Sequence, residues 1–526
     1  MSETLRSYSA GARAGRALKR RGGRVRWVLA IVAAVVLGHA AWTIRDTAPL
    51  HTLIPAEQKY GIYMKDIVMK REALEQSFLW EALPGVWEGA PAMLRDGPPA
   101  PDWVLNNLAG RMCFITGNDL AAFSDAVLLT RMTPVGTLLE RYSRLGPWSE
   151  VDHAGGLRLR KLRDTDVYYA VRGRSLALSA SRTSLIHALT LDGGEAMPQA
   201  RFEATVNMDG PEDVGGTIVL EESDPYGPIL RNGSFALRVE ADRIEARGRA
   251  VLHPELEART APLRAGLAEG RLPAPLPGML AVAGDFGMTL EELYLAVGEA
   301  TEWSAFSPEQ WAAWADPGQD GENAVGPLLT SVLGGMGPDF AITLAAVNGR
   351  EFVPLPELTA VLGGPVDVMA MLMAMAPEDG GAAPWESTPR RDEDAGMVYI
   401  PMAGGPSLEP SIMEHGGAIL AATSRNALED ALAAPEAAGS LLDREGNLYL
   451  RAEPAPLVEA LSDVGRQLAE AHMLRGYTPE SFGADTEEWL RRARVIEHMD
   501  LLAAAEDGAI VAELTVQGRP QGTPEP

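Results

Sequence analysis

The sequence has one cysteine, few lysines and few aromatic residues. Cys113 is the only cysteine, so no disulfide bond can form within the chain. The apolar run around it predicts a buried, inert thiol, because no histidine stands in a motif that would support a nucleophile. Only five of the 46 basic residues are lysines, a bias typical of a GC-rich bacterial genome. Aromatic residues make up 6% of the chain, so its core must be mostly aliphatic.

Common catalytic signatures are also missing. The chain contains no G-x-S-x-G elbow, S-x-x-K pair, phosphate loop, H-E-x-x-H or C-x-x-C motif. We therefore expect a protein that is not an enzyme, with no catalytic, cofactor-binding or metal-binding residues and no cofactor. A hydrolase with paired carboxylates is the least favoured alternative, since so many acidic residues form pairs by chance. Only a pair with a raised pKa in a cleft would support it.

One acidic loop partly resembles a calcium site. Asp316, Asp320 and Gly321 match positions 1, 5 and 6 of a calcium-binding loop, but Gly318 and Pro327 stand at positions 3 and 12. Two oxygen ligands are therefore missing, and an acidic surface turn is the better prediction.

Two apolar segments could in principle contact ligands. Residues 366–376 contain four methionines, and three tryptophans lie within residues 303–314. A Met-rich surface can bind varied apolar partners, and tryptophans can form a ligand platform. The first segment is apolar all round, which predicts a buried helix. The second is predicted to pack as a helix against a sheet.

The N-terminus has the pattern of a membrane anchor. Eight basic residues lie within residues 6–26, and an apolar run of 18 residues follows, from Trp27 to Ile44. As a helix this run would extend roughly 27 Å, close to the thickness of a hydrocarbon core. The basic cluster predicts a cytoplasmic N-terminus and an extracytoplasmic remainder, in a bacterial inner membrane. A cleaved signal peptide is the alternative, because Gly38 and Ala40 suit a signal peptidase.

The remainder of the chain is strongly acidic. Nine basic residues and one acidic residue lie in residues 1–45, which leaves 37 basic and 71 acidic residues beyond them. A net charge of −34 repels nucleic acid, so we expect no nucleic-acid partner. The possible partners are envelope proteins or lipid, besides the membrane around the predicted span.

A segment is repeated 243 residues later in the chain. Residues 173–189 and 416–432 are identical at six of 17 aligned positions, including a glycine and a Ser-Arg pair. Each copy has an apolar run typical of a buried strand, then apolar residues at helical spacing. Ser181 and Ser424 are predicted helix N-caps. Arg182 and Arg425 could bind a ligand, but exposure in the first turn or pairing with a carboxylate is favoured.

Other fragments recur in the same order. Residues 59–83, 279–297 and 447–461 each predict a strand followed by an amphipathic helix, with Thr289 and Glu292 as a capping box in the second. Residues 234–252 and 501–517 each predict a β-hairpin. We therefore expect a duplicated region with halves at 46–255 and 275–518, each ending in a hairpin. Convergence of Ala- and Leu-rich segments is the alternative.

The fold class that follows is α+β. An N-terminal transmembrane helix (27–44) follows a basic cytoplasmic tail (1–26) and precedes the duplicated antiparallel domain of strand-helix units. Residues 519–526 are predicted to be a disordered tail. Residues 315–323 and 376–396, rich in Gly, Pro and charge, are predicted surface loops.

This order of elements resembles a family of membrane-anchored bacterial envelope proteins with a domain of unknown function. The resembling features are the basic tail, the single apolar span, the stretch LIPAE at residues 53–57, and residues 168–189 with their later counterpart. The resemblance implies placement and architecture but no chemistry. Our leading hypothesis is a non-enzymatic extracytoplasmic scaffold or interaction protein tethered to the inner membrane. The alternative is binding or transport of an apolar ligand or lipid in the envelope.

Overall fold

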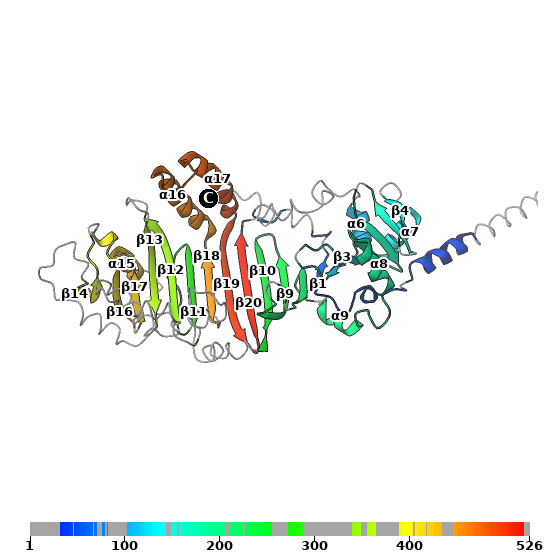
Figure 1. The fold of residues 1–526 in the computed structure, drawn as a ribbon, viewed down its shortest axis with the longest axis horizontal. Coiled ribbons are helices and arrows are strands. Elements are labelled where there is room, and N and C mark those ends of the chain that lie inside the picture. Colours follow the sequence, from blue (N-terminus) through cyan, green and yellow to red (C-terminus); the bar gives the residue numbers. More distant parts are fainter. Residues whose placement is uncertain are drawn as a thin grey trace, which may run out of the picture. The chain divides into compact units, whose positions relative to one another are not determined.

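The computed structural model describes residues 32–82, 102–254, 272–285, 339–348, 355–363, 389–433 and 445–519, with shorter gaps inside several of these ranges. The chain divides into two compact units. The smaller unit consists of residues 1–69 and 96–210, and the larger unit of residues 70–95 and 211–526. Figure 1 shows antiparallel strands and packed helices in each of them, which confirms the predicted α+β class.

The smaller unit is built on a seven-stranded antiparallel sheet. Its strands lie in the order β1 (Tyr60–Lys65), β2 (Met112–Gly117), β3 (Val127–Arg131), β7 (Ser175–Ser179), β6 (Tyr168–Arg172), β5 (Leu157–Leu162) and β4 (Ser149–Ala154). Its helical segments are η1 (Leu50–Leu53), α6 (Asp102–Ala109), α7 (Pro134–Ser143), α8 (Arg182–Thr190) and α9 (Gln199–Thr205).

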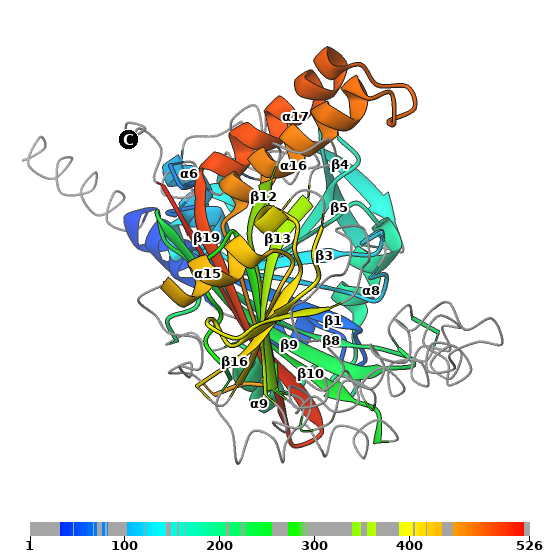
Figure 2. The same cartoon turned by 90° about the vertical axis from the view of Figure 1, so that its left-hand side faces the viewer.

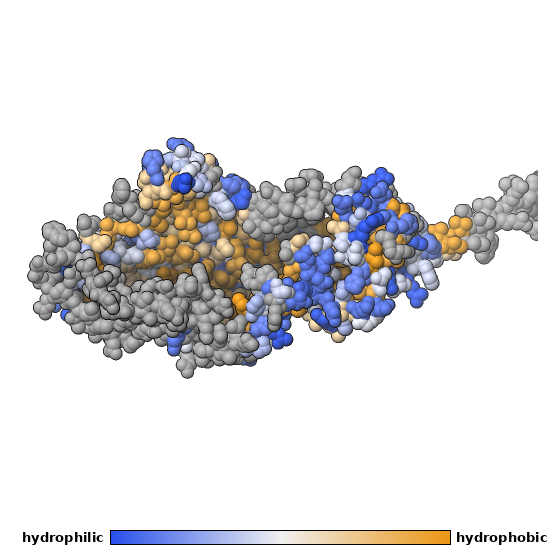
Figure 3. Space-filling model, viewed as in Figure 1, coloured by the Kyte–Doolittle hydropathy of each residue, from blue (hydrophilic) through white to orange (hydrophobic). Residues whose placement is uncertain are grey.

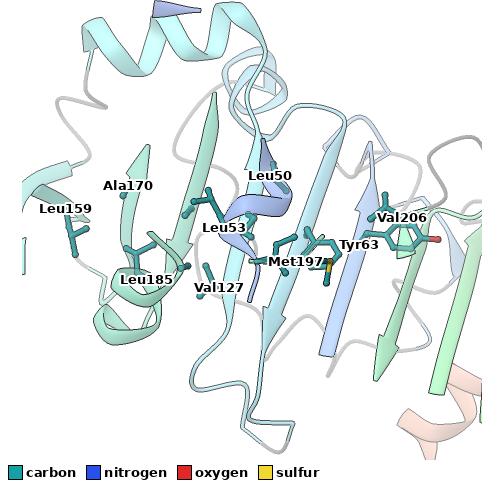
Figure 4. Close-up of a cluster of buried hydrophobic side chains, with 14 residues drawn as sticks. Leu50, Leu53, Tyr63, Val127, Leu159, Ala170, Leu185, Met197 and Val206 are labelled. Atoms are coloured by element: carbon teal, nitrogen blue, oxygen red, sulfur yellow. The ribbon is translucent and has the colours of Figure 1, made fainter. Parts of the chain in front are cut away.

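Both faces of this sheet carry a hydrophobic core. On one face, η1 and α8 pack on the strands, and Leu53, Leu185 and Ala177 are fully buried (Figure 4). On the other face, Leu108 of α6 packs with Tyr169 and Leu176. Leu176 and Ala177 are neighbours on β7, and alternation along the strand sends them to opposite faces. The sheet of the smaller unit is therefore covered on both sides.

The larger unit contains a thirteen-stranded antiparallel sheet. The order is β8 (Val214–Val219), β9 (Leu230–Val239), β10 (Arg243–Leu252), β20 (Ala509–Gly518), β19 (Ile496–Glu506), β18 (Leu448–Ala452), β11 (Leu280–Asp285), β12 (Asp339–Asn348), β13 (Leu355–Leu362), β17 (Ala418–Ala422), β16 (Ser411–His415), β15 (Met397–Tyr399) and β14 (Arg390–Asp392).

Helix α15 (Arg425–Ala433) covers one end of this sheet through Leu428, which packs on Val361 and Leu420. Helices α16 (Pro454–Glu470) and α17 (Pro479–Arg494) form an antiparallel hairpin between β18 and β19. Figure 2 shows these two helices lying side by side.

One strand order occurs twice. The series β1-β2-β3-β7-β6-β5-β4 of the smaller unit has the same connectivity as the series β11-β12-β13-β17-β16-β15-β14 of the larger unit. In each series the fourth strand, β7 or β17, leads directly into a helix, α8 or α15. The turn glycines Gly173 and Gly416 have the same φ of 63°, in the left-handed region that favours glycine.

Several local predictions are confirmed. Ser181 caps α8 by accepting from the Ser184 amide, and the Ser424 hydroxyl accepts from the Ala427 amide at the start of α15. The two β-hairpins are β9–β10 and β19–β20. Strand β18 leads into α16 as expected. The calcium-like loop, the Met-rich and Trp-rich segments and the capping box at Thr289 lie outside the described residues.

The predicted membrane span is described only in part. Residues 32–43 are helical, and residues 27–31 lie outside the described range. Val35, Leu37 and Trp42 of this helix are 65%, 68% and 71% exposed. Over the part of the chain that the structure describes, no helix combines the length and hydropathy needed to cross a membrane.

Candidate functional site

The larger unit carries a continuous apolar surface over its central strands. Because side chains alternate along a strand, residues directly opposite each other on neighbouring strands share a face. We call one such set the apolar face. From β9 to β12 it comprises Phe235, Leu237, Ala246, Gly248, Ala250, Ile510, Ala512, Leu514, Leu501, Ala503, Leu448, Leu450, Leu280, Val282, Ile342 and Leu344.

The apolar face is partly open. None of these sixteen residues falls in the buried class, and Ile342 and Ile510 are 41% and 37% exposed. Ala505 and Gly284, which lie on the same side opposite Ile510 and Leu448, are buried. Its centre consists of small side chains, where Gly248 pairs with Ala512 and Ala512 with Ala503. A Cβ atom added at Gly248 would meet nothing within 4 Å, so the space above this glycine is empty. Figure 3 shows hydrophobic residues gathered over the central strands, with the α16–α17 hairpin above them.

On β10 and β20 the opposite face is charged. Arg247 of β10 forms an ion pair with Glu513 of β20 at 3.0 Å, and Arg249 pairs with Glu506 at 2.6 Å. These side chains are about half exposed or more. An antiparallel sheet commonly buries its apolar face and exposes its polar face. On β10 and β20 this polar face is solvated, whereas Tyr449, Ala283 and Ala341 on the corresponding face of β18, β11 and β12 belong to a buried core. The apolar face stays partly exposed.

One end of the apolar face is closed by a short segment. Phe78 is 1% exposed and packs with Ile244 and Val516, together with Val495 beyond α17. A Cβ atom on Gly518 would lie 2.3 Å from the Phe78 ring. The Phe78 ring therefore covers this end of the apolar face, and the solvent-exposed part of the face lies over the centres of the strands.

The repeated Ser-Arg pair has a structural role in each unit. Arg182 of α8 donates to Asp152 of β4 and lies over the ring of Tyr168, 5.0 Å from its centroid. Each arginine joins the first turn of a helix to an edge strand of its sheet. Pairing with a carboxylate, rather than ligand binding, is the observed arrangement.

Arg425 of α15 donates to Asp392 of β14 at 2.6 Å and lies over Tyr399 at 5.4 Å. Asp152 faces Leu159, and Asp392 faces Met397, at matching register positions. The hydrogen bond from Arg182 lowers the pKa of Asp152. The pKa of Asp392 is lowered mainly by a hydrogen bond from the Ala395 amide and, to a smaller extent, by Arg425.

The remaining candidate residues do not form a catalytic site. Cys113 is 6% exposed, which confirms the predicted burial, and burial raises the pKa of its thiol to about 11. His187 and Asp430 are exposed at matching positions of α8 and α15. In the described part of the chain, no group of three metal-ligating side chains comes together.

Two carboxylates do meet at the end of β11 and β12. Asp285 lies opposite Asp339 in the ladder, and burial, then repulsion from Asp285, raises the pKa of Asp339. Asp339 is packed against its own chain, since a Cβ atom on Gly363 would lie 2.0 Å from its carboxylate oxygen. This packing indicates a structural pair rather than a substrate cleft.

Sequence reasoning identified the hairpins but missed the apolar face. The signal was present in β10, where Arg243, Glu245, Arg247 and Arg249 alternate with Ile244, Ala246, Gly248 and Ala250. A strict alternation of charged and apolar residues is typical of a sheet with two different faces.

Comparison with known proteins gives only a distant structural similarity. No protein-family profile matches the chain, and no curated protein sequence matches it. Crystal form I of the Treponema protein TP0453 aligns with a TM-score of 0.26 and 10% sequence identity, and the alignment covers 40% of this chain and 80% of the TP0453 chain. Crystal form IV has a TM-score of 0.26 and 12% identity, with 42% and 87% covered. The resemblance to a family of anchored envelope proteins therefore stays a prediction.

Proposed function

We propose that this protein is a non-enzymatic, membrane-tethered envelope protein that holds the acyl chains of lipids on its apolar face. The observation that carries the proposal is the continuous, partly open apolar face from β9 to β12, with empty space above Gly248. Soluble monomers rarely expose large contiguous apolar patches unless the patch binds a ligand, a membrane or a partner.

The dimensions of the face favour long apolar chains. Seven strands span six interstrand steps of about 4.8 Å, so the face is roughly 29 Å long. Two or three residues per strand face the same side, which makes it roughly 7–14 Å wide. The strip is therefore long and narrow, with a length close to the ~30 Å hydrocarbon thickness of a bilayer. Small residues occupy the centre of the face on β10, β20 and β19, and they leave room there for an acyl chain.

The tether is the second part of the proposal. The basic tail and the apolar run from Trp27 to Ile44 support a retained span with a cytoplasmic N-terminus. The exposed Val35, Leu37 and Trp42 on helix 32–43 also support it, because such side chains are stabilised in a bilayer. Fusions to alkaline phosphatase after residue 45 and at the C-terminus should both be active. Cytoplasmic fluorescence of a C-terminal reporter would contradict this topology.

A protein partner is the second candidate, and the α16–α17 hairpin favours it. Leu461, Met473, Tyr477 and Trp489 on this hairpin are 56%, 67%, 44% and 64% exposed. Exposed aromatic and methionine side chains are enriched at interfaces. Crosslinking in intact cells with Trp489→Ala as the comparison would test this role. Failure to recover a protein whose crosslink depends on Trp489 would argue against it.

The matching strand orders support an internal duplication. The shared caps, the two turn glycines and the two Arg–Asp pairs occur at corresponding positions. The two hairpins β9–β10 and β19–β20 would then be corresponding elements, each following one copy of the series. An experimental structure in which the two strand series fail to superpose would refute the duplication.

The lipid-binding proposal can be tested without destabilising the sheet. Gly248→Leu places a side chain into the empty space on the apolar face, and a β-strand tolerates leucine better than glycine. Ser234→Leu, on the opposite face of β9, is the matched control. Native mass spectrometry of the purified full chain should show a copurifying lipid in the wild type and in Ser234→Leu, and much less in Gly248→Leu. Equal lipid in all three proteins, or none in the wild type, would overturn the proposal.

A further inference from the structure

Helix α7 of the smaller unit turns apolar residues outward. Its buried residues are Gly136, Thr137 and Glu140. Val135 and Tyr142, in contrast, are 52% and 60% exposed. Residues seven apart lie within about 20° of each other around a helix, so these two side chains share one face. A surface helix of a globular protein normally buries its apolar side and exposes its polar side, and α7 does the reverse.

Two leucines extend this outward face. Leu138 and Leu139 lie between Val135 and Tyr142, at the spacings of three and four residues that place side chains on one side of a helix. Both are only partly buried. We call these four residues the α7 stripe.

The α7 stripe meets the predicted membrane span. The Tyr142 ring packs edge-on against the ring of His39 on helix 32–43, with centroids 6.1 Å apart. His39 lies five residues before Ile44, the last residue of the span, which is roughly 7.5 Å along a helix. An interfacial helix places its apolar face about 5–10 Å into the boundary between headgroups and acyl chains. With residues 27–44 across the bilayer, Tyr142 therefore lies at the depth of an interfacial side chain.

A short connection keeps the smaller unit beside the span. Ala48 is 3% exposed, and its carbonyl oxygen accepts a hydrogen bond from the Ser175 hydroxyl at 2.8 Å. The turn at Gly173 approaches the same segment, since a Cβ atom there would lie 2.9 Å from Thr47 Oγ1. The four residues from Ile44 to Ala48 extend at most roughly 14 Å. This end of the smaller unit therefore stays close to the end of the span.

The side chains at this junction suit a lipid surface. Trp42 is 71% exposed, and the guanidinium group of Arg45 lies 5.9 Å from the centroid of its ring. Arg141, next to Tyr142, is also exposed. Trp42, Arg45 and Arg141 line a crevice of about 410 Å³ between the two helices, together with the buried Glu140. Tryptophan and tyrosine are enriched at membrane interfaces, and basic side chains near the surface are attracted to anionic headgroups.

We propose that the α7 stripe is a second membrane contact, which lies in the extracytoplasmic leaflet of the bilayer that residues 27–44 span. Arg45 and Arg141 then lie at the level of the lipid phosphates. This inference rests on the proposed membrane tether, and it does not depend on lipid binding by the apolar face of the larger unit. Contact at both the span and α7 restricts rotation of the smaller unit about its tether.

The proposal also gives the smaller unit an orientation. Strand β7 starts next to the Gly173 turn and ends at Ser179, which pairs with Val127 at the start of β3. The turn between β2 and β3, which contains the exposed Ala122, therefore lies at the end of the sheet opposite Gly173. The Gly173 end faces the bilayer, and the Ala122 end faces away from it.

Fluorescence quenching by spin-labelled lipids tests the proposal. The full-length chain is reconstituted in vesicles of phosphatidylethanolamine and phosphatidylglycerol, with a polarity-sensitive fluorophore on one introduced cysteine. Native labelling is selective because Cys113 is buried. Val135→Cys and Tyr142→Cys carry the fluorophore on the α7 stripe. Ala122→Cys is the matched control at the far end of the sheet, and Val36→Cys reports on the span itself.

Lipid with a nitroxide near the headgroup should lower the fluorescence at positions 135 and 142 about twofold or more, and leave position 122 unchanged. A nitroxide deep in the acyl chain should quench position 36 most strongly. Quenching at position 36, with positions 135 and 142 behaving like position 122, would overturn the α7 contact and leave the tether standing. No quenching at position 36 would refute the tether, and this inference with it.

Discussion

Replacing Asn447 by alanine should destabilise the larger unit by about 3 kcal/mol. Asn447 is 4% exposed and links three strands of the central sheet. Its Nδ2 donates to the Asp285 carbonyl oxygen at 3.0 Å, and its Oδ1 accepts from the Ala505 amide at 2.7 Å. Asp285 and Ala505 are themselves buried, so alanine would leave a carbonyl and an amide without these partners. Each such group costs about 1–3 kcal/mol.

Urea unfolding of the full chain, followed by circular dichroism, checks this value. With a slope of about 3 kcal/mol/M, the transition of the larger unit should move down by roughly 1 M. Asn232→Ala is the control, because Asn232 is exposed on β9, and it should change stability by less than about 0.5 kcal/mol. A shift for Asn447→Ala as small as that of the control would show that the side chain does not hold the three strands together.

Three further outcomes follow from the structure. Asp339→Asn should raise the free energy of unfolding at pH 7 by up to about 1 kcal/mol, because the pKa of Asp339 is raised and the wild type loses stability as the pH rises through that pKa. The gain of the variant over the wild type should be larger at pH 7 than at pH 3, and an equal gain at both pH values would contradict this. Double-mutant cycles should give a larger coupling for Arg425 and Asp392, still below about 1 kcal/mol, than for Arg182 and Asp152, because the Arg425 side chain is 24% exposed and that of Arg182 is 47% exposed. A larger coupling for Arg182 and Asp152 would be inconsistent with this difference in burial. Cys113 should react with a thiol reagent only after denaturant is added, since it is 6% exposed and the pKa of its thiol is about 11, and rapid reaction of the native chain would show an open site.

Local elements were predictable because their signals are local. Serine before a helical apolar pattern identified both N-caps, and short acidic turns between apolar runs identified both hairpins. The recurrence of these fragments predicted a duplication but not the order in which the strands pair. None of these inferences required knowledge of which strands pair over long distances.

The apolar face was not predictable from the same signals. Gly248 and Ala512 lie opposite each other although 264 residues separate them, and sequence patterns do not give such pairings. The aromatic partners of the repeated arginines were missed for a similar reason. Tyr168 comes from β6, whereas Tyr399 comes from β15, so the two copies reach the same arrangement from different strands.

The most direct test of the central claim is photocrosslinking from the two faces of β20 in intact cells. A photoreactive phenylalanine analogue at position 512 lies on the apolar face, and one at position 511 lies on the charged face. Mass spectrometry should find lipid attached at position 512 and not at position 511. Lipid attached equally at both positions, or at neither, would contradict the account of this face as the surface that holds acyl chains.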